Sequence, residues 1–258
     1  MKLAGKVALV TGGGTGIGKT ISAALARSGA KIAIASRSQT HLSAAREYFR
    51  GIGLEVLSVP LDVRIKEQVE KGIQRIGEEW GNIHILVNNA GVSGINPIEE
   101  RDDARWHDIL DTNLTGMYLV TKETLKYMKD PAGGRIINIS SVLGRFGVPG
   151  YTAYCASKHG ILGFTKALAL EVVARGITVN AICPGWVETE MARQGIDESA
   201  AREGMTPDEF KKQAIEAMPI KRFLDAEEVA ELVLYLCSAH AGGITGQAVN
   251  VCGGQTMN

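Results

Sequence analysis

Residues 6–18 read KVALVTGGGTGIG, a short apolar run followed at once by a turn that holds five glycines. The apolar run is typical of a buried strand, and the residues after the turn favour a helix that ends before Gly29. Glycines between a strand and a helix let backbone N–H groups and the helix N-terminus approach a pyrophosphate. A tight turn that binds nothing is the alternative. Five glycines within seven positions favour a nucleotide site.

The spacing of this turn is Thr-Gly-x3-Gly-x-Gly. It has one more residue between its first two key glycines than the common dinucleotide fingerprint Gly-x-Gly-x-x-Gly. The turn alone therefore indicates a nucleotide without specifying which one.

Short apolar runs alternate with helical patterns along the rest of the chain, which predicts a parallel sheet with helices on both faces. The expected strands are Lys6–Val10, Lys31–Ala35, Glu55–Leu61, Ile83–Val87, Arg135–Ile139, Thr178–Cys183 and Ala248–Val251. The expected helices end at Ser28, cover Gln39–Arg50, Ile65–Trp80, Ala104–Lys129 and Tyr151–Arg175, and start again at Asp225. No linker or repeat interrupts residues 1–258, so one domain is predicted.

The composition limits the class of function. Lys and Arg total 28, as do Asp and Glu, so no net charge points to nucleic acid or to an anionic membrane. Cys155, Cys183, Cys237 and Cys252 are far apart, which predicts buried thiols in a reducing compartment rather than disulfides or a zinc site. The histidines are scattered, so no metal is expected. The first ten residues are too polar for a signal peptide, and no run approaches membrane-spanning length, so a cytoplasmic protein is expected.

A second stretch carries residues suited to proton transfer. Tyr154 and Lys158 are four residues apart in a helix-favouring run and so share one helix face. The ammonium is expected to lower the pKa of the phenol from roughly 10, so that Tyr154 can exchange a proton near neutrality. Ser141 follows a predicted strand at its carboxyl end, where open α/β sheets bind ligands. Because the pattern is short, Tyr-x-x-x-Lys alone favours a chance surface pair on a helix; the nucleotide turn elsewhere in the chain shifts the interpretation to an active site.

These motifs, together with Asn88-Asn89-Ala90-Gly91, Asn113 and Pro184-Gly185, occur in the order and spacing of the short-chain dehydrogenase/reductase family. The chain resembles that family over essentially its whole length. The resemblance implies a Rossmann-like, doubly wound sheet of about seven strands that binds a nicotinamide dinucleotide.

The resemblance also implies a catalytic tetrad of Asn113, Ser141, Tyr154 and Lys158. In that scheme Tyr154 protonates a carbonyl oxygen and Ser141 hydrogen-bonds the same oxygen. Lys158 holds the cofactor ribose and tunes Tyr154, and Asn113 anchors a proton-relay water. Two hydroxyls that converge on one oxygen stabilise the charge that develops there.

The end of the second strand predicts which dinucleotide binds. NAD sites place an acid about 20 residues beyond the glycines, but Ser36 and Arg37 stand there. A guanidinium can bind a 2′-phosphate bidentately, so NADP(H) is expected; an exposed charge at a helix start is the alternative for Arg37. Asp62 matches the family residue that hydrogen-bonds the adenine. The implied cofactor contacts are Thr11, Gly12, Gly14, Thr15, Gly16, Ile17, Gly18, Ser36, Arg37, Asp62, Val63, Asn89, Ala90, Gly91, Tyr154, Lys158, Pro184, Gly185, Val187 and Thr189.

Within the family, the chain most resembles 3-oxoacyl-thioester reductases and polyketide ketoreductases. The stretches DTNLTG (111–116), CPGWVET (183–189) and NVCGG (250–254) carry this resemblance. Two positions depart from it: VSG (92–94) replaces the Pro-Gly-Gly of aromatic-polyketide ketoreductases, and Ala132 replaces one member of a basic pair whose other member is Arg175. Lys126 or Lys129 is the candidate substitute.

The predicted function is NADP(H)-dependent reduction of a ketone, with a 3-oxoacyl thioester or polyketide-type substrate, free or bound to a carrier protein. A dehydrogenase of a free alcohol or ketone, such as a sugar, a steroid or a small hydroxyketone, is the alternative enzyme. A non-catalytic NADP-binding regulator is a third possibility, although such proteins tend to lose the Tyr or the Lys.

Residues 186–223 are too long for an ordinary connection and are predicted to form a substrate lid. Thr206-Pro207-Asp208-Glu209 reads as the capped start of a short helix inside it. Its apolar residues are expected to contact an acyl chain or, alternatively, to pack the lid onto the body: Met191, Ile196, Met205, Phe210, Ile215 and Met218. The helices 104–129 and 151–175 are predicted to assemble a homotetramer, the alternative being that their apolar residues only cover the sheet.

Overall fold

The computed structural model describes residues 3–99, 102–131 and 133–257. Its strands are β1 (Val7–Thr11), β2 (Lys31–Ser36), β3 (Val56–Pro60), β4 (Ile85–Asn88), β5 (Arg135–Ile139), β6 (Thr178–Pro184) and β7 (Ala248–Val251). They form one parallel seven-stranded sheet in the order β3-β2-β1-β4-β5-β6-β7. The chain order reverses between β1 and β4, so the crevice at their carboxyl ends is the expected ligand site. The predicted single-domain, doubly wound α/β fold is confirmed.

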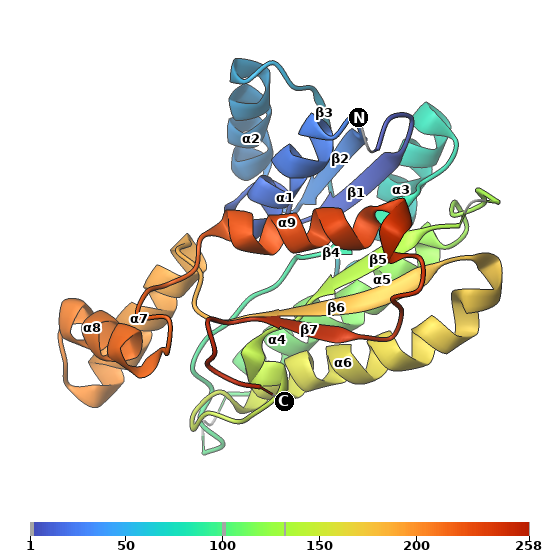
Figure 1. Cartoon of the computed structure of the whole chain (residues 1–258). Helices are drawn as coiled ribbons and strands as arrows, with labels where there is room; N and C mark the ends of the chain where they lie inside the picture. The colour runs from blue at the N-terminus through green and yellow to red at the C-terminus, as the bar shows by residue number, and fades with distance from the viewer. Residues whose placement is uncertain (1–2, 100–101, 132, 258) are drawn as a thin grey trace.

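Helices cover both faces of this sheet (Figure 1). They are α1 (Gly16–Arg27), α2 (Gln39–Gly51), α3 (Lys66–Trp80), α4 (Ala104–Leu110), α5 (Gly116–Thr124), α6 (Thr152–Val172), α7 (Glu190–Glu203), α8 (Pro207–Ala217) and α9 (Ala226–Cys237). Alternate residues of each strand point to opposite faces, so each strand contributes to two cores.

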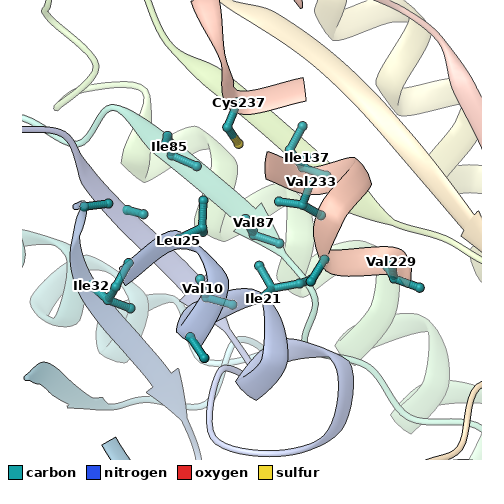
Figure 2. Close-up of a cluster of buried hydrophobic side chains, with 14 of the residues drawn as sticks. Val10, Ile21, Leu25, Ile32, Ile85, Val87, Ile137, Val229, Val233 and Cys237 are labelled. Carbon is teal, nitrogen blue, oxygen red and sulfur yellow. The ribbon is translucent and has the colours of Figure 1, made fainter. Parts of the chain in front are cut away.

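One core lies under α1, α2 and α9. Figure 2 shows Ile21 and Leu25 of α1 and Val229 and Val233 of α9 over the same face of the sheet, where they belong to one buried cluster. The strands supply the other side of this core through Val10, Ile32, Ile85, Val87 and Ile137. On the opposite face, α3, α5 and α6 cover the intervening strand residues, among them Leu9, Leu86 and Val179. Both cores are apolar, which fixes the sheet between two helical layers.

The predicted helix 104–129 is helical from Ala104 to Thr124, but its middle is not regular. A π-helical segment, Asp111–Thr115, joins α4 to α5, and the Gly116 N–H bonds the Asp111 carbonyl five residues back. The helix also ends early, at Thr124, because the Tyr127 carbonyl turns to accept a hydrogen bond from the Ile83 N–H at 3.0 Å. This tertiary contact leads the chain into β5 and overrides the local helix propensity.

The segment 186–223 contains two helices, α7 and α8, of which only the second was expected. The capping box of Thr206 and Glu209 starts α8 as predicted, and Thr189 caps α7 by accepting from the Ala192 N–H. Both helices project beyond the carboxyl ends of the strands (Figure 1). Ile196 of α7 packs with Met218 and Phe223, which follow α8, in a small core of their own.

Candidate active site

The glycine turn between β1 and α1 has a backbone that other residues cannot adopt. Gly12 and Gly16 have φ angles of +63° and +48°. A Cβ on Gly18 would lie 2.3 Å from the Gly12 carbonyl oxygen and 2.4 Å from Asn89 Nδ2. The first turn of α1 therefore lies directly against the loop, and its N-terminus opens toward the crevice.

Thr11 and Asn89 hold this loop against the end of β4. The Thr11 hydroxyl accepts from the backbone N–H groups of Asn89 and Ala90, both at 3.0 Å. Asn89 Nδ2 in turn donates to the carbonyls of Thr11 (3.0 Å) and Gly12 (3.3 Å). These two predicted cofactor residues act on the shape of the glycine turn.

Asn88, the other amide of the corner, faces away from the crevice. Its Nδ2 donates to Thr121 Oγ1 at 2.8 Å and to Asn138 Oδ1 at 2.9 Å. Asn138 then donates to Thr165 Oγ1 at 2.9 Å, so a buried chain of side chains joins β4 and β5 to α5 and α6. This network positions the helices that carry the tetrad.

A cavity of about 480 Å³ lies at the carboxyl ends of β1, β2 and β4. Eight of the predicted cofactor residues line it: Gly12, Thr15, Ser36, Arg37, Asp62, Val63, Ala90 and Gly91. Sequence reasoning missed several other lining residues, among them Ser38, His41, Val92, Arg105, Asp108, Thr112 and Glu198. The Thr112 hydroxyl is buried there without a hydrogen-bond partner among the described residues.

Arg37 lies at the far end of this cavity with its side chain half exposed. Its Nη1 is 3.9 Å from Asp108 Oδ1, which also accepts from Arg64 Nη1 at 2.7 Å. The Arg64 guanidinium also hydrogen-bonds Asp62, and this contact lowers the pKa of the Asp62 carboxyl. The Asp62 carboxylate, expected at the adenine, is thus already engaged by Arg64.

The cavity wall carries four carboxylates, and each is paired with an arginine. Asp62 and Asp108 bind Arg64 as described, Glu198 accepts from Arg105 at 3.1 Å, and Glu190 bonds Arg193. Pairing reduces the repulsion that these acids would exert on a polyanionic ligand.

The tetrad residues come together at the start of α6. Tyr154 and Lys158 lie about one turn apart on α6, and beside them the Ser141 hydroxyl accepts from the Leu143 N–H at 3.1 Å. The Ser140 hydroxyl ties α6 to the end of β5 by donating to the Lys158 carbonyl at 2.9 Å. Lys158 is 5 % exposed, and its Nζ donates to the Ile139 carbonyl at 2.9 Å.

The pKa values of Tyr154 and Lys158 are determined mainly by burial and not by the attraction between the two side chains. Desolvation raises the pKa of Tyr154 to about 12, partly offset by its hydrogen bond with Ser141. Desolvation lowers the pKa of Lys158 to about 8. The predicted lowering of the Tyr154 pKa is therefore wrong for the cofactor-free protein. Lys158 Nζ lies 5.5 Å from the centre of the phenol ring and is directed at Ile139.

Asn113 occupies the centre of the π-helical segment and is 1 % exposed. Its Oδ1 accepts from the Val92 N–H at 2.8 Å, and its Nδ2 donates to the Val92 carbonyl and to Ser157 Oγ. Ser157 Oγ donates to the Tyr154 carbonyl at 2.8 Å. A Cβ on Gly91 would approach Asn113 Oδ1 to 3.2 Å and Lys158 Nζ to 3.7 Å, which places all three together.

A second cavity, of about 250 Å³, adjoins the first. Ser141 and Tyr154 open into it, as do the predicted residues Ile17, Gly185, Val187 and Thr189. Its other walls are largely apolar and include Val142, Phe146, Val148, Trp186, Met191 and Phe210. Ser93, Met191 and Gly195 line both cavities, so a ligand in one meets a ligand in the other there.

The remaining predicted residues line neither of these two cavities. They are Thr11, Gly14, Gly16, Gly18, Asn89, Asn113, Lys158 and Pro184. Arg175, the expected carrier-protein contact, instead donates from Nη2 to the carbonyls of Leu125 (2.9 Å) and Met128 (3.0 Å). Ala132, at the paired position, lies outside the described residues.

Within the described ranges, no cluster of three His, Cys, Asp or Glu side chains is arranged to hold a metal ion. The same ranges contain no helix that combines the length and the apolar character needed to cross a bilayer.

Comparisons with known proteins agree with this geometry. The model of the family described as Enoyl-(Acyl carrier protein) reductase matches residues 12–256. The 3-oxoacyl-[acyl-carrier-protein] reductase of Haemophilus influenzae is 40% identical over 250 residues, which are 97% of this chain and 98% of that protein.

Two solved structures share the whole architecture. A crystal structure of a variant of the actinorhodin polyketide ketoreductase with NADPH has a TM-score of 0.93 and 41% identity, with 97% of each chain covered. That of levodione reductase has a TM-score of 0.92 and 32% identity, with 98% of each chain covered. The chain belongs to the short-chain dehydrogenase/reductase family of oxidoreductases.

Proposed function

We propose that this protein is an NADP(H)-dependent ketoreductase that reduces a 3-oxoacyl thioester or a polyketide-type ketone to a secondary alcohol. One observation carries the proposal: Ser141 and Tyr154 both line a largely apolar cavity that adjoins the nucleotide cavity. The relatives named as 3-oxoacyl and polyketide ketoreductases support it.

The large cavity fits NADP(H) by its chemistry. Its glycine turn admits a pyrophosphate at the N-terminus of α1, and Arg37 supplies a cation at the end where a 2′-phosphate would lie. NADPH, when bound, supplies the hydride for the reduction.

The chain's own residues handle the oxygen and the proton. Ser141 and Tyr154 donate to the carbonyl oxygen and stabilise its developing charge, and Tyr154 then gives up its proton. Its raised pKa keeps the phenol protonated at neutral pH, as a donor must be. With a pKa of about 8, Lys158 is still mainly cationic at neutral pH, so it can stabilise the phenolate that the transfer leaves.

Residues 186–223 form the lid of this site in our proposal. Met191 of α7 lines both cavities and Phe210 of α8 lines the second. Ile196 and Met218 pack inside the lid, and Met205 is 38% exposed. The apolar lid residues thus divide between substrate contact and internal packing, which combines the two expectations drawn from the sequence.

A homotetramer and a cytoplasmic location remain predictions. Among the apolar residues of these two helices, Val120 and Leu168 are buried in the core against the protein's own sheet. Leu170, on the outer side of α6, is 80% exposed, and Tyr118 on α5 is 44% exposed. These exposed side chains support a partner on this face. Light scattering tests it: a monomeric mass would exclude the tetramer, and Leu170→Asp should reduce the mass of an assembly.

A substrate panel followed by NADPH absorbance at 340 nm tests the function. We expect the highest kcat/KM for a 3-oxoacyl thioester, less for its oxygen ester and least for a sugar ketone. Met191→Ala and Phe210→Ala should lower kcat/KM for the thioester, whereas Met205→Ala, a matched change outside the cavity, should not. A preference for the sugar would favour the free-ketone alternative, which the likeness to levodione reductase supports. NADPH binding without turnover of any ketone would favour a regulator.

A further inference from the structure

One wall of the second cavity is polar, in contrast to the rest of its lining. Arg202, near the end of α7, lies there with Tyr151 and Ser199. Arg202 Nη1 donates to the Pro149 carbonyl at 2.9 Å. Among the residues that the structure describes, no carboxylate oxygen lies within 4 Å of its guanidinium, unlike Arg105 and Arg193 nearby.

The position of the guanidinium depends on the loop before α6. Gly150 has a φ of +83°, and a Cβ there would lie 2.0 Å from Arg202 Nη1. The positive φ favours glycine at this position, and the missing side chain leaves room for Arg202 Nη1. The hydrogen bond to the Pro149 carbonyl holds the cation at the cavity wall.

The side chains of Arg202, Tyr151 and Ser199 offer more hydrogen-bond donors to the cavity than their protein partners accept. A guanidinium has five N–H groups, and the structure shows one protein bond to them, to Pro149. The hydroxyl oxygens of Tyr151 and Ser199 are 3.0 Å apart, and either can be the donor. Whichever donates, the hydroxyl proton of the other stays available. A guanidinium beside a free hydroxyl is suited to an oxyanion.

One negatively charged side chain also lies on this wall of the cavity. Glu203 follows Arg202 and also lines the cavity, without an ion pair to Arg202 within 4 Å. Arg202, Tyr151 and Ser199 line the same cavity as Tyr154, so a substrate that holds its ketone at Tyr154 can place a second group against this wall.

We propose that Arg202, Tyr151 and Ser199 form a subsite for a carboxylate carried by the substrate at a position remote from its ketone. This inference rests on the proposed ketoreductase function and narrows its substrate class to oxoacyl compounds with a distal ionised carboxyl. The neutral ester of the same compound lacks the charge that the guanidinium recognises.

The test uses a matched pair of substrates, the 1-methyl monoester and the dimethyl ester of 3-oxoadipate. They differ only in the distal carboxylate. The wild type should show the higher kcat/KM for the monoester. Arg202→Gln should reduce kcat/KM for the monoester about ten-fold and leave kcat/KM for the diester unchanged. A ten-fold loss corresponds to the lower end of the free energies of charge-assisted hydrogen bonds, as expected for an exposed group. Glu203→Gln should increase the preference for the monoester.

Lys212→Gln is the control, since it removes the same charge from an exposed position on α8 that lines none of the cavities described; it should change neither rate. Equal rates for both esters in the wild type, or an equal loss for both in Arg202→Gln, would overturn the subsite. The proposed function is judged separately, by the 3-oxoacyl thioester assay; if NADPH reduces neither oxygen ester, the subsite is tested by binding alone. Monoester titrated against the fluorescence of Trp186, in the same cavity, should then bind about ten-fold more weakly to Arg202→Gln; unchanged affinity refutes the subsite.

Discussion

Replacing Lys158 by Met should remove a specific part of the pH dependence of stability. Lys158 is 5 % exposed, and burial lowers its pKa from 10.5 to about 8. The unfolded chain therefore binds more protons than the folded one between these two pH values. Stability consequently rises as the pH increases through this window, and below pH 8 the destabilisation by the buried ammonium is constant.

The size of the effect follows from the two pKa values. A shift of one unit corresponds to about 1.36 kcal/mol, and between pH 7 and pH 9.5 the Lys158 contribution to the unfolding free energy should increase by about 2 kcal/mol. Tyr154 acts in the opposite direction because its folded pKa of about 12 exceeds the ordinary value of 10.0. Its stabilisation is lost only above pH 10, outside the window chosen.

Urea denaturation of the cofactor-free wild type and of Lys158→Met at pH 7 and pH 9.5, at one protein concentration, measures this contribution. The wild type should gain about 2 kcal/mol more than the variant over this interval. Loss of the bond to the Ile139 carbonyl changes the variant at both pH values and cancels in the comparison. An identical pH dependence in both proteins would show that the ammonium is not destabilised by burial.

Three further substitutions test the cofactor site. Arg37→Ala should reduce the preference for NADPH over NADH by about ten-fold to a hundred-fold, measured by kcat/KM for each cofactor; a wild type that prefers NADH would refute the role. Asp108→Asn should strengthen NADPH binding about two- to five-fold and leave NADH unchanged, because it removes a carboxylate 3.9 Å from Arg37; equal gains for both cofactors would contradict this. Gly18→Ala should weaken NADPH binding at least ten-fold by fluorescence titration, since its methyl would lie 2.3 Å from the Gly12 carbonyl oxygen; unchanged affinity would contradict the close packing.

The sheet and the glycine turn could be predicted because the local sequence pattern there favours the same conformation that the tertiary packing stabilises. Each strand reads as an apolar run bounded by turn residues, and Gly12 and Gly16 have positive φ angles that only glycine adopts readily. The π-helical segment around Asn113 carries no such signal. It depends on how α4 and α5 pack on the body, where a Cβ on Gly116 would lie 2.6 Å from a methyl of Val63.

The electrostatics of the site could not be read from spacing. Four-residue spacing correctly placed Tyr154 and Lys158 on one helix face, but it carries no information on desolvation, which dominates both pKa values. The pairing of Asp62 with Arg64 was equally hidden, because two residues so close in sequence meet only through a turn. Glu198, on a helix that the sequence did not reveal, reaches the cofactor cavity through its contacts with Arg105 and the Ile95 N–H.

Tyr154 is the proton donor in the proposed NADPH-dependent ketone reduction. This role is tested by comparing the wild type, Tyr154→Phe and the exposed control Tyr48→Phe in 340 nm assays with a 3-oxoacyl thioester, alongside NADPH titrations. We expect a loss of about 10²–10⁴-fold in kcat for Tyr154→Phe alone, with NADPH affinity nearly unchanged because the ring still packs in place. Turnover by Tyr154→Phe within ten-fold of the wild type would contradict it.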